Sequence, residues 1–323
     1  MVAFSVVREG RGVVSGTVGR IAEMAIREFE VLRKKHHHDW YCDGGRDLLK
    51  NMIRQKVSDG EGIRFVLPSF PCKSQNRDNT LGKSPDLGEE LALGALHSLC
   101  DRISRDYEPG ASIVLASDGR LYADLIGVPD GDVLSYRDSL LSMYSSMVSA
   151  AGGVQRIGWY SLDEAFPRVD GGDGKRAALI GAYPQDIGRI MGLVHSDEHY
   201  NRVYVGFKNM VISELSVDKA RSRNSIDKEA SRVARAMMER NFANADLIAN
   251  RFPGAVRLSI KHHDTRTGKF GVNLLPGHDD VGTPWLNVVV EKDGSYDFIK
   301  SRQAQERGYE LCYKGDQPYY YRG

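Results

Sequence analysis

The first group of side chains suited to chemistry follows a short apolar run at residues 63–67. Its polar members are Lys73, Ser74, Asn76 and Lys83. A lysine can move a proton or hold a phosphate as a point charge, while serine and asparagine donate neutral hydrogen bonds. Lys73 and Lys83 could therefore hold a phosphate or carboxylate of a substrate, with Ser74 and Asn76 as neutral donors. A solvated loop is the alternative, since proline and asparagine also form turns. The Gly-x-x-x-x-Gly-Lys motif of nucleotide-binding loops is absent.

A second polar group follows the apolar run at 112–116 and contains Asp118, Arg120 and Asp124. Asp118 is a candidate catalytic base or orienting group, and Arg120 could clamp an anion through two parallel hydrogen bonds. Asp124 is expected to line the same opening. The Asp118-Gly119 pair fits a simple turn equally well, so both interpretations stand.

The third group begins with Arg257, Ser259 and Lys261, which alternate along an apolar stretch. Alternate residues of a strand face the same side, so these three polar groups are expected to form one wall of a cavity. A phosphate or carboxylate ligand would supply the negative charge that two cations at such a wall require. Lys269 and Trp285 are further substrate-binding candidates, although a tryptophan is more often part of the core.

Two histidines, His262 and His263, follow that stretch and are candidate proton-transfer groups. With Asp264 they also form the His-x-Asp pattern that begins one type of iron site. A complete site would need a third ligand, and the one later histidine, His278, lies very close in sequence. We therefore predict no metal site.

Charge and hydropathy exclude two classes of partner. The 44 basic residues are balanced by 43 acidic residues, so the excess of positive charge typical of a nucleic-acid-binding protein is missing. No apolar run approaches the roughly 20 residues that span a bilayer. Residues 1–19 lack the apolar core of a signal peptide. We expect a cytoplasmic protein that acts on small molecules.

The four cysteines do not suggest a disulfide framework or a zinc site. They are far apart in sequence and form no Cys-x-x-Cys pair; they are Cys42, Cys72, Cys100 and Cys312. Three consecutive histidines at 36–38 could bind a metal together with Cys42, but a helix end with its favourable dipole explains them better. We expect reduced thiols.

The elements that must position these groups alternate between helix and strand. Apolar spacing predicts helices at 19–35, 86–107, 133–151, 187–194, 200–215 and 227–250. Short β-branched runs predict strands at 63–67, 112–116 and 157–161. Later runs at 256–260, 271–275 and 286–290 are interpreted as antiparallel strands, with Asp293-Gly294 as a hairpin turn and 319–322 as a loosely held tail.

This alternation is typical of an α/β fold with a mainly parallel sheet flanked by helices. We divide the chain into a helical N-terminal segment, residues 1–60, and an α/β catalytic domain, residues 61–323. In such sheets ligands bind outside the carboxyl ends of the strands, where the first two polar groups are expected.

Several motifs together resemble the pyoverdine/dityrosine biosynthesis family of isocyanide (isonitrile) synthases over about residues 60–300. They are Pro68-Ser69-Phe70-Pro71-Cys72-Lys73-Ser74, Pro85-Asp86-Leu87-Gly88-Glu89-Glu90, Ser117-Asp118-Gly119-Arg120, Ala255-Val256-Arg257-Leu258-Ser259-Ile260 and Thr283-Pro284-Trp285. The resemblance implies a Rossmann-like fold. It also implies histidine at two positions where this chain has Lys261 and Leu286.

The activity that the resemblance implies is unusual. The α-amino nitrogen of an amino acid, typically tryptophan or tyrosine, takes a carbon from C2 of ribulose 5-phosphate and becomes an isonitrile. No metal or organic cofactor is implied, and a separate iron/2-oxoglutarate oxygenase processes the product. Proton transfer would come from Lys73, Asp118 and His262 or His263, and anion binding from Lys83, Arg120, Arg257 and Lys269.

Two other classes of protein are alternatives on the residues alone. An iron/2-oxoglutarate oxygenase would need a complete His/Asp/His set on a β-rich chain, and a nucleotide or sugar-phosphate binding module would carry a glycine fingerprint after its first strand. Neither pattern is present.

Overall fold

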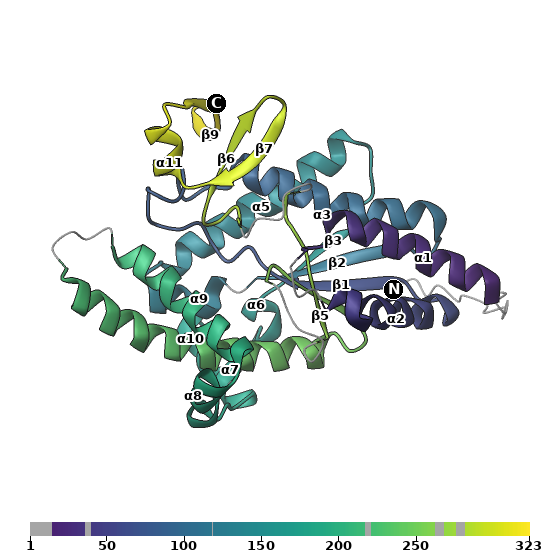
Figure 1. The fold of residues 1–323 in the computed structure, drawn as a ribbon, viewed down its shortest axis with the longest axis horizontal. Coiled ribbons are helices and arrows are strands. Elements are labelled where there is room, and N and C mark those ends of the chain that lie inside the picture. Colours follow the sequence, from purple (N-terminus) through teal and green to yellow (C-terminus); the bar gives the residue numbers. More distant parts are fainter. Residues whose placement is uncertain (1–14, 36–39, 118, 217–220, 262–267, 276–281) are drawn as a thin grey trace.

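A parallel sheet forms the centre of the molecule (Figure 1). The computed structural model describes residues 15–35, 40–117, 119–216, 221–261, 268–275 and 282–323. Within these residues five strands pair in the order β3-β2-β1-β4-β5, and every neighbouring pair is parallel. They are β1 (Ile63–Pro68), β2 (Ala111–Ala116), β3 (Ile157–Tyr160), β4 (Val256–Ser259) and β5 (Lys269–Gly271). The predicted α/β fold with a Rossmann-like sheet is confirmed.

Four long helices cover one face of this sheet. They are α1 (Ser15–Leu32), α2 (Arg46–Ser58), α3 (Leu87–Asp106) and α5 (Asp130–Ala150). Phe65 and Leu67 of β1 pack in one apolar core with residues from all four helices, such as Phe29 of α1. The N-terminal helices therefore share the core of the sheet, while the division at residue 60 stays a prediction. A π-type turn, η1 (Tyr41–Gly45), precedes α2.

The opposite face is covered by α10 (Arg223–Arg251), whose Ile248 packs on Val66 and Ala116. Beside α10 lie α7 (Gly172–Ala182), α8 (Ile187–Ser196) and α9 (Glu198–Leu215), grouped at the lower left of Figure 1. The predicted helices at 187–194, 200–215 and 227–250 are thus confirmed. Short helices α4 (Gly119–Tyr122), η2 (Ala123–Ile126) and α6 (Leu162–Ala165) connect the sheet to this group.

A smaller sheet lies at the top of Figure 1. Its described strands are β6 (Val288–Lys292), β7 (Ser295–Ile299), β8 (Glu310–Lys314) and β9 (Gln317–Arg322), with α11 (Ser301–Glu306) between β7 and β8. The pairs β6-β7 and β8-β9 are antiparallel, as predicted near the C-terminus, whereas β6 and β9 are parallel. Both residues of the Asp293-Gly294 turn have positive φ, the geometry of a tight hairpin.

Two details of the C-terminal prediction were wrong. The runs at 256–260 and 271–275 were expected among antiparallel strands, but β4 is a parallel member of the central sheet, and its parallel neighbour β5 ends at Gly271, where the second run begins. The strand order places β4 beside β1, a long-range pairing that a run of four residues does not encode. The tail is also not loose, because β9 pairs on both sides and buries Tyr319 and Tyr321.

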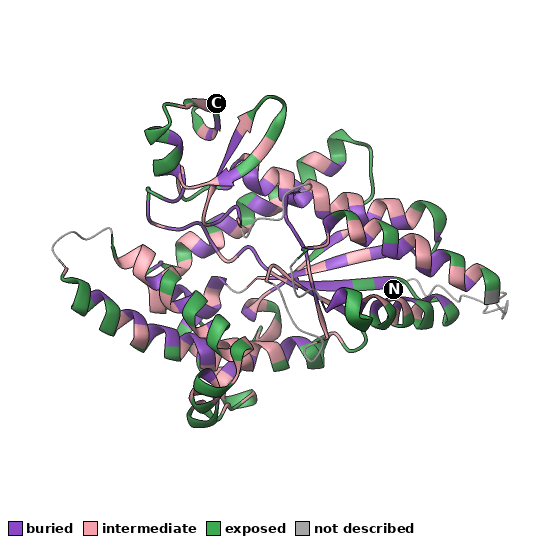
Figure 2. Ribbon diagram, viewed as in Figure 1, coloured by how far each residue is buried: buried purple, intermediate pink, exposed green. Residues whose placement is uncertain are grey.

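Burial follows the layers of the fold (Figure 2). The helices bury the side that faces the sheet and expose the other, which is the pattern of amphipathic helices packed on a central sheet. Among the described helices, none combines the length and the apolar character needed to cross a bilayer.

Candidate active site

A cavity of about 360 Å³ lies at the carboxyl ends of β1 and β4. In the order β3-β2-β1-β4-β5, the chain places β2 and β3 on one side of β1 and then β4 and β5 on its other side. The strand order therefore reverses between β1 and β4. Ligands of open α/β sheets bind at such a switch point. The described lining comes from the loop after β1, helix α4 and the segment to Val128, helices α9 and α10, the end of β4 and residues beyond it, Lys269 of β5, and Thr283, Trp285 and Leu286.

The loop after β1 is held in a strained shape. Phe70 has a φ of 52°, a left-handed conformation that is costly for a bulky residue. The ring is buried and packs on Trp285 and Trp159, with centroids 5.2 Å and 6.4 Å away. The backbone carbonyl of Phe70 also accepts a hydrogen bond from Ser117, at 3.0 Å. Burial and these contacts fix the loop where it lines the cavity.

Lys73 lies at the base of this loop with its ammonium group fully buried. Nζ is 2.7 Å from Asp86, 2.9 Å from Glu89 and 2.8 Å from the carbonyl oxygen of Pro284. Burial lowers the pKa of Lys73, but the two carboxylates outweigh it and hold the pKa above its ordinary value. The geometry gives Lys73 a positioning role, and its proton-transfer role stays a prediction.

The two carboxylates that bind Lys73 also cap helix α3. Asp86 accepts a hydrogen bond from the backbone N–H of Gly88, and Glu89 accepts one from the backbone N–H of Asp86, both at 2.9 Å. This is a capping box. Tyr136 of α5 donates a further bond to Glu89 at 2.8 Å. Burial raises the pKa of Asp86, against the charge of Lys73.

Ser74 connects the loop after β1 to the end of helix α9. Its hydroxyl donates a hydrogen bond to Glu214, and the Asn79 amide donates one to the Ser74 hydroxyl at 3.1 Å. Asn76 donates to the backbone carbonyl of Ser213 at 2.9 Å. Ser74 and Glu214 line the cavity, whereas Asn76 supports the loop from behind.

Glu214 was not among the sequence candidates. It ends a stripe on α9 that continues through Met210, Phe207 and Val203, spaced by three and four residues, and all four line the cavity. The sequence did contain a signal for this residue: a carboxylate ends a helical stripe that is otherwise apolar. From α10, Phe242 adds a ring stacked on Tyr200, with centroids 5.1 Å apart.

The part of the cavity wall formed by β4, β5 and Lys261 is cationic. Arg257 and Lys269 are register partners on the parallel strands β4 and β5, so their side chains share one face. Ser259, Lys261 and Lys269 line the cavity, while Arg257 lies behind them and donates to the carbonyl of Ala245 at 3.5 Å. The predicted alternation is present, because Leu258 and Phe270 face the apolar core on the other side.

The charges of this wall interact. Burial, then the charges of Arg257 and Lys261, lower the pKa of Lys269 to about 8. Burial also lowers the pKa of Arg257, with Asp246 acting against it. The Lys261 ammonium stacks 4.9 Å from the centroid of the Phe207 ring. This concentration of positive charge is suited to an anionic group on a ligand.

Besides Asn76 and Arg257, three further sequence candidates lie away from the described lining of this cavity. Lys83 is exposed and pairs with Asp132 at 2.7 Å. Arg120 is near Asp163, with its Nε 3.3 Å from the carboxylate. Asp124 accepts two hydrogen bonds from Arg240, at 2.6 and 2.8 Å. Burial alone would raise the pKa of Asp124, but Arg240 and then Arg176 outweigh it and lower that pKa.

The remaining candidates are Trp285, Asp118, His262 and His263. Trp285 is buried, packs on Phe70 and lines the cavity, so it is both a core residue and a wall. Asp118 and the two histidines lie outside the described residues, and their catalytic roles stay predictions. Within the described part of the chain, no three histidine, cysteine or acidic side chains are gathered as metal ligands.

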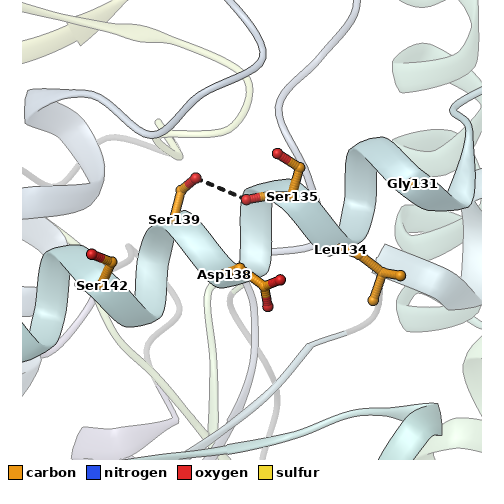
Figure 3. A pocket seen from close by; sticks show the side chains of 6 residues that line it. All are labelled: Gly131, Leu134, Ser135, Asp138, Ser139 and Ser142. Carbon is orange, nitrogen blue, oxygen red and sulfur yellow. Dashed lines mark hydrogen bonds between the residues drawn. The ribbon is translucent and has the colours of Figure 1, made fainter.

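A second hollow runs along helix α5 (Figure 3). Its lining residues all belong to that helix; they are Gly131, Leu134, Ser135, Asp138, Ser139 and Ser142. Ser139 donates a hydrogen bond to the backbone carbonyl of Ser135 at 2.8 Å. This hollow brings together no basic side chain and no second element, unlike the cavity at the switch point.

Comparisons with known proteins find relatives over most of the chain. A curated L-tyrosine isonitrile synthase of Pseudomonas aeruginosa is 33% identical over 270 residues, which are 82% of this chain and 81% of that protein. The L-tryptophan isonitrile synthase AmbI2 of Fischerella ambigua is 32% identical, over 83% of this chain and 80% of its own. The crystal structure of the PvcA protein from Pseudomonas aeruginosa superimposes with a TM-score of 0.86 at 30% identity, covering 94% of this chain and 99% of that chain.

The family model described as "Pyoverdine/dityrosine biosynthesis protein" matches residues 53–312. The match includes the loop after β1, both wall-forming helices and the cationic strands. On this match and on the identity of its relatives, the chain belongs to the pyoverdine/dityrosine biosynthesis family.

Proposed function

We propose that this chain is an isocyanide synthase that converts the α-amino group of tyrosine or tryptophan to an isonitrile, with the carbon taken from C2 of ribulose 5-phosphate. One observation carries the proposal. A single cavity joins a wall of cations, a wall of aromatic and apolar side chains, and the carboxylate of Glu214. The named activities of the relatives support the amino-acid half of the reaction.

The cationic wall suits the sugar phosphate. Lys261 and Lys269 line the cavity, and Arg257 adds its charge from behind. Burying positive charge without an anion is costly, and a phosphate group would offset that cost on binding. Ser259, on the same wall, supplies a neutral hydroxyl for the sugar.

The wall formed by α9 and α10 suits the aromatic amino acid. Phe207, Met210 and Phe242 present apolar surface to the cavity, and Asn241 adds an amide among them. Aromatic rings stack favourably on such side chains, and sulfur contacts with rings are also favourable. An amide beside this surface can bind a phenol hydroxyl or an indole N–H.

Glu214 lines the same cavity at the end of α9 and would act on the reacting nitrogen. The first step joins the amine of the amino acid to the ketone carbon of the sugar phosphate and releases water. The amine must lose a proton before it attacks, and a carboxylate within reach can accept that proton. Ser74 donates a hydrogen bond to Glu214 and thereby fixes its orientation. In this proposal no metal or organic cofactor takes part, and a separate iron/2-oxoglutarate oxygenase consumes the isonitrile.

The test is incubation of the full chain with ribulose 5-phosphate and each of the twenty amino acids. Isonitrile would be measured by mass spectrometry and by trapping with a tetrazine. Isonitrile from tyrosine or tryptophan that depends on ribulose 5-phosphate is the expected result. If the sugar phosphate binds without turnover of any amino acid, the chain is a binding module. Oxidation of a substrate that requires iron and 2-oxoglutarate would instead identify an oxygenase.

A further inference from the structure

One amine in the cavity differs from the other cations of its wall. Lys269 begins β5 and lines the cavity next to Arg257 and Lys261. Within the described residues its ammonium group has no hydrogen bond and no ion pair, whereas Lys73 is held by two carboxylates. A partly buried lysine beside other cations is the arrangement that produces a nucleophilic amine.

We propose that Lys269 forms an imine with the ketone carbon of the sugar phosphate, so that the sugar is held covalently before the amino acid attacks. This inference rests on the proposed function and adds a covalent step to it. A phosphate held by Lys261, with the charge of Arg257 behind it, would leave the other end of a sugar phosphate inside the same cavity, which Lys269 also lines.

The step is balanced without any redox partner. The neutral Nζ attacks the ketone carbon, a C–N bond forms as the C=O π bond breaks, and one proton passes from nitrogen to oxygen, which becomes a hydroxyl group. The second nitrogen proton then passes to that hydroxyl group, the C–O bond breaks, and water leaves as the C=N bond forms. The amine of the amino acid then adds to the same carbon and displaces Nζ, which restores Lys269 and gives the imine between amino acid and sugar.

The surroundings of Lys269 favour the neutral amine that this step needs. Burial is the larger cause of its lowered pKa, and the charges of Arg257 and Lys261 add to it. A phosphate bound to those two cations would offset their charge, while the effect of burial remains. A protonated imine is also a better electrophile than a ketone, so the covalent intermediate would speed attack by the amino acid.

The experiment is reductive trapping. The full chain is mixed with ribulose 5-phosphate and sodium cyanoborohydride, and the intact mass is measured. The expected product gains the mass of one sugar phosphate less one oxygen atom. Peptide mapping should locate the adduct on Lys269. The control Lys228→Arg, an exposed lysine of α10, should give the same adduct. Adducts spread over exposed lysines, with none on Lys269, would overturn the proposal.

Two variants distinguish an imine-forming role of Lys269 from a role as a positive charge only. Lys269→Arg keeps the positive charge but cannot form an imine, and it should lower isonitrile turnover by roughly a hundredfold or more, the scale of losing a positioned reacting group. Lys269→Ala should regain part of its activity when methylamine is added. Near-normal turnover of the folded Lys269→Arg enzyme would show that only the charge matters.

Parallel assays keep this proposal distinct from the proposed function. Isonitrile formed by the wild-type enzyme without any trapped adduct would reject the imine and leave the synthase activity standing. Absence of isonitrile from every amino acid would reject the synthase activity and, with it, the sugar phosphate as the partner of Lys269.

Discussion

The ammonium group of Lys73 lies 2.7 Å from the carboxylate of Asp86, and neither side chain has contact with solvent. This pair joins the loop after β1 to the first turn of α3. The same ammonium binds the carbonyl oxygen of Pro284, beside the cavity wall formed by Trp285. Three of the family motifs therefore meet at one buried lysine.

Replacing Lys73 with Met should destabilise the fold strongly. Asp86 and Glu89 would remain buried without their counter-ion, and breaking a buried pair in this way costs about 3–5 kcal/mol. Urea unfolding followed by circular dichroism measures the change. Lys83→Met is the matched control, because the exposed pair with Asp132 contributes only about 0–1 kcal/mol. Equal stability of the two variants would contradict the positioning role of Lys73.

Glu214→Gln should slow turnover by roughly a hundredfold while leaving the fold intact. The glutamine oxygen still accepts the hydrogen bond of Ser74, but the amide cannot accept the proton of the amine. Steady-state kinetics with tyrosine gives kcat, and thermal unfolding checks stability. Glu198→Gln, an exposed position on the same helix, should behave as wild type. A fall in Tm with unchanged kcat would point to a structural role.

Arg257→Leu should weaken binding of the sugar phosphate by roughly tenfold, since it removes a positive charge from behind the wall, and a charge a few ångströms from an anion contributes about 1–4 kcal/mol. Stability should stay equal or increase, because the variant removes a buried charge with little compensation. The KM for ribulose 5-phosphate is the measurement, with Arg235→Leu on the exposed side of α10 as the control. An unchanged KM would remove Arg257 from the binding wall.

Phe242→Ala should raise the KM for tyrosine roughly tenfold, because aromatic contacts add about 0.5–1.5 kcal/mol beyond the apolar area that they bury. The KM for the sugar phosphate should not change, as Phe242 belongs to α10 and adds no charge to the wall that would hold the phosphate. The control is Phe252→Ala, which removes a ring that packs on Tyr160 and is not among the described lining residues. Parallel rises in both constants would indicate general loosening of the cavity.

The yield of trapped adduct should increase as the pH rises through about 8, the pKa that burial, Arg257 and Lys261 give to Lys269. Below that pH the amine is protonated and cannot attack, and above it the neutral form dominates. An ordinary exposed lysine would continue to gain reactivity up to about pH 10.4. A yield that follows only the higher value would assign the reaction to surface lysines.

The main elements of the fold could be predicted because each carries a local pattern. The strands β1, β2 and β3 are short apolar runs, and α3 begins with a capping box that is readable as Asp86 and Glu89. The pairing of β4 with β1 could not be predicted, because strand order depends on packing between residues far apart in sequence. The same limit applies to β9. Its aromatic and basic sequence does not reveal that it pairs with β6 and β8.

The site was predicted in part for a similar reason. The position of Ser74 after a strand of the parallel sheet and the alternation of Ser259 with Lys261 both predicted an opening, and these three residues line the cavity. The same logic misplaced Lys83, because its loop turns outward to Asp132. Glu214 was missed because its helix approaches the sheet only through tertiary packing.

The strained backbone of Phe70 has a consequence for the thermodynamics of ligand binding. A loop that folding has already fixed loses little conformational entropy when a ligand arrives, so more of the contact energy appears as affinity. Phe70→Gly would relieve the positive φ and remove the ring contacts with Trp285. Calorimetry of such a variant should show a larger entropic penalty on binding, even where the contacts with the ligand are unchanged.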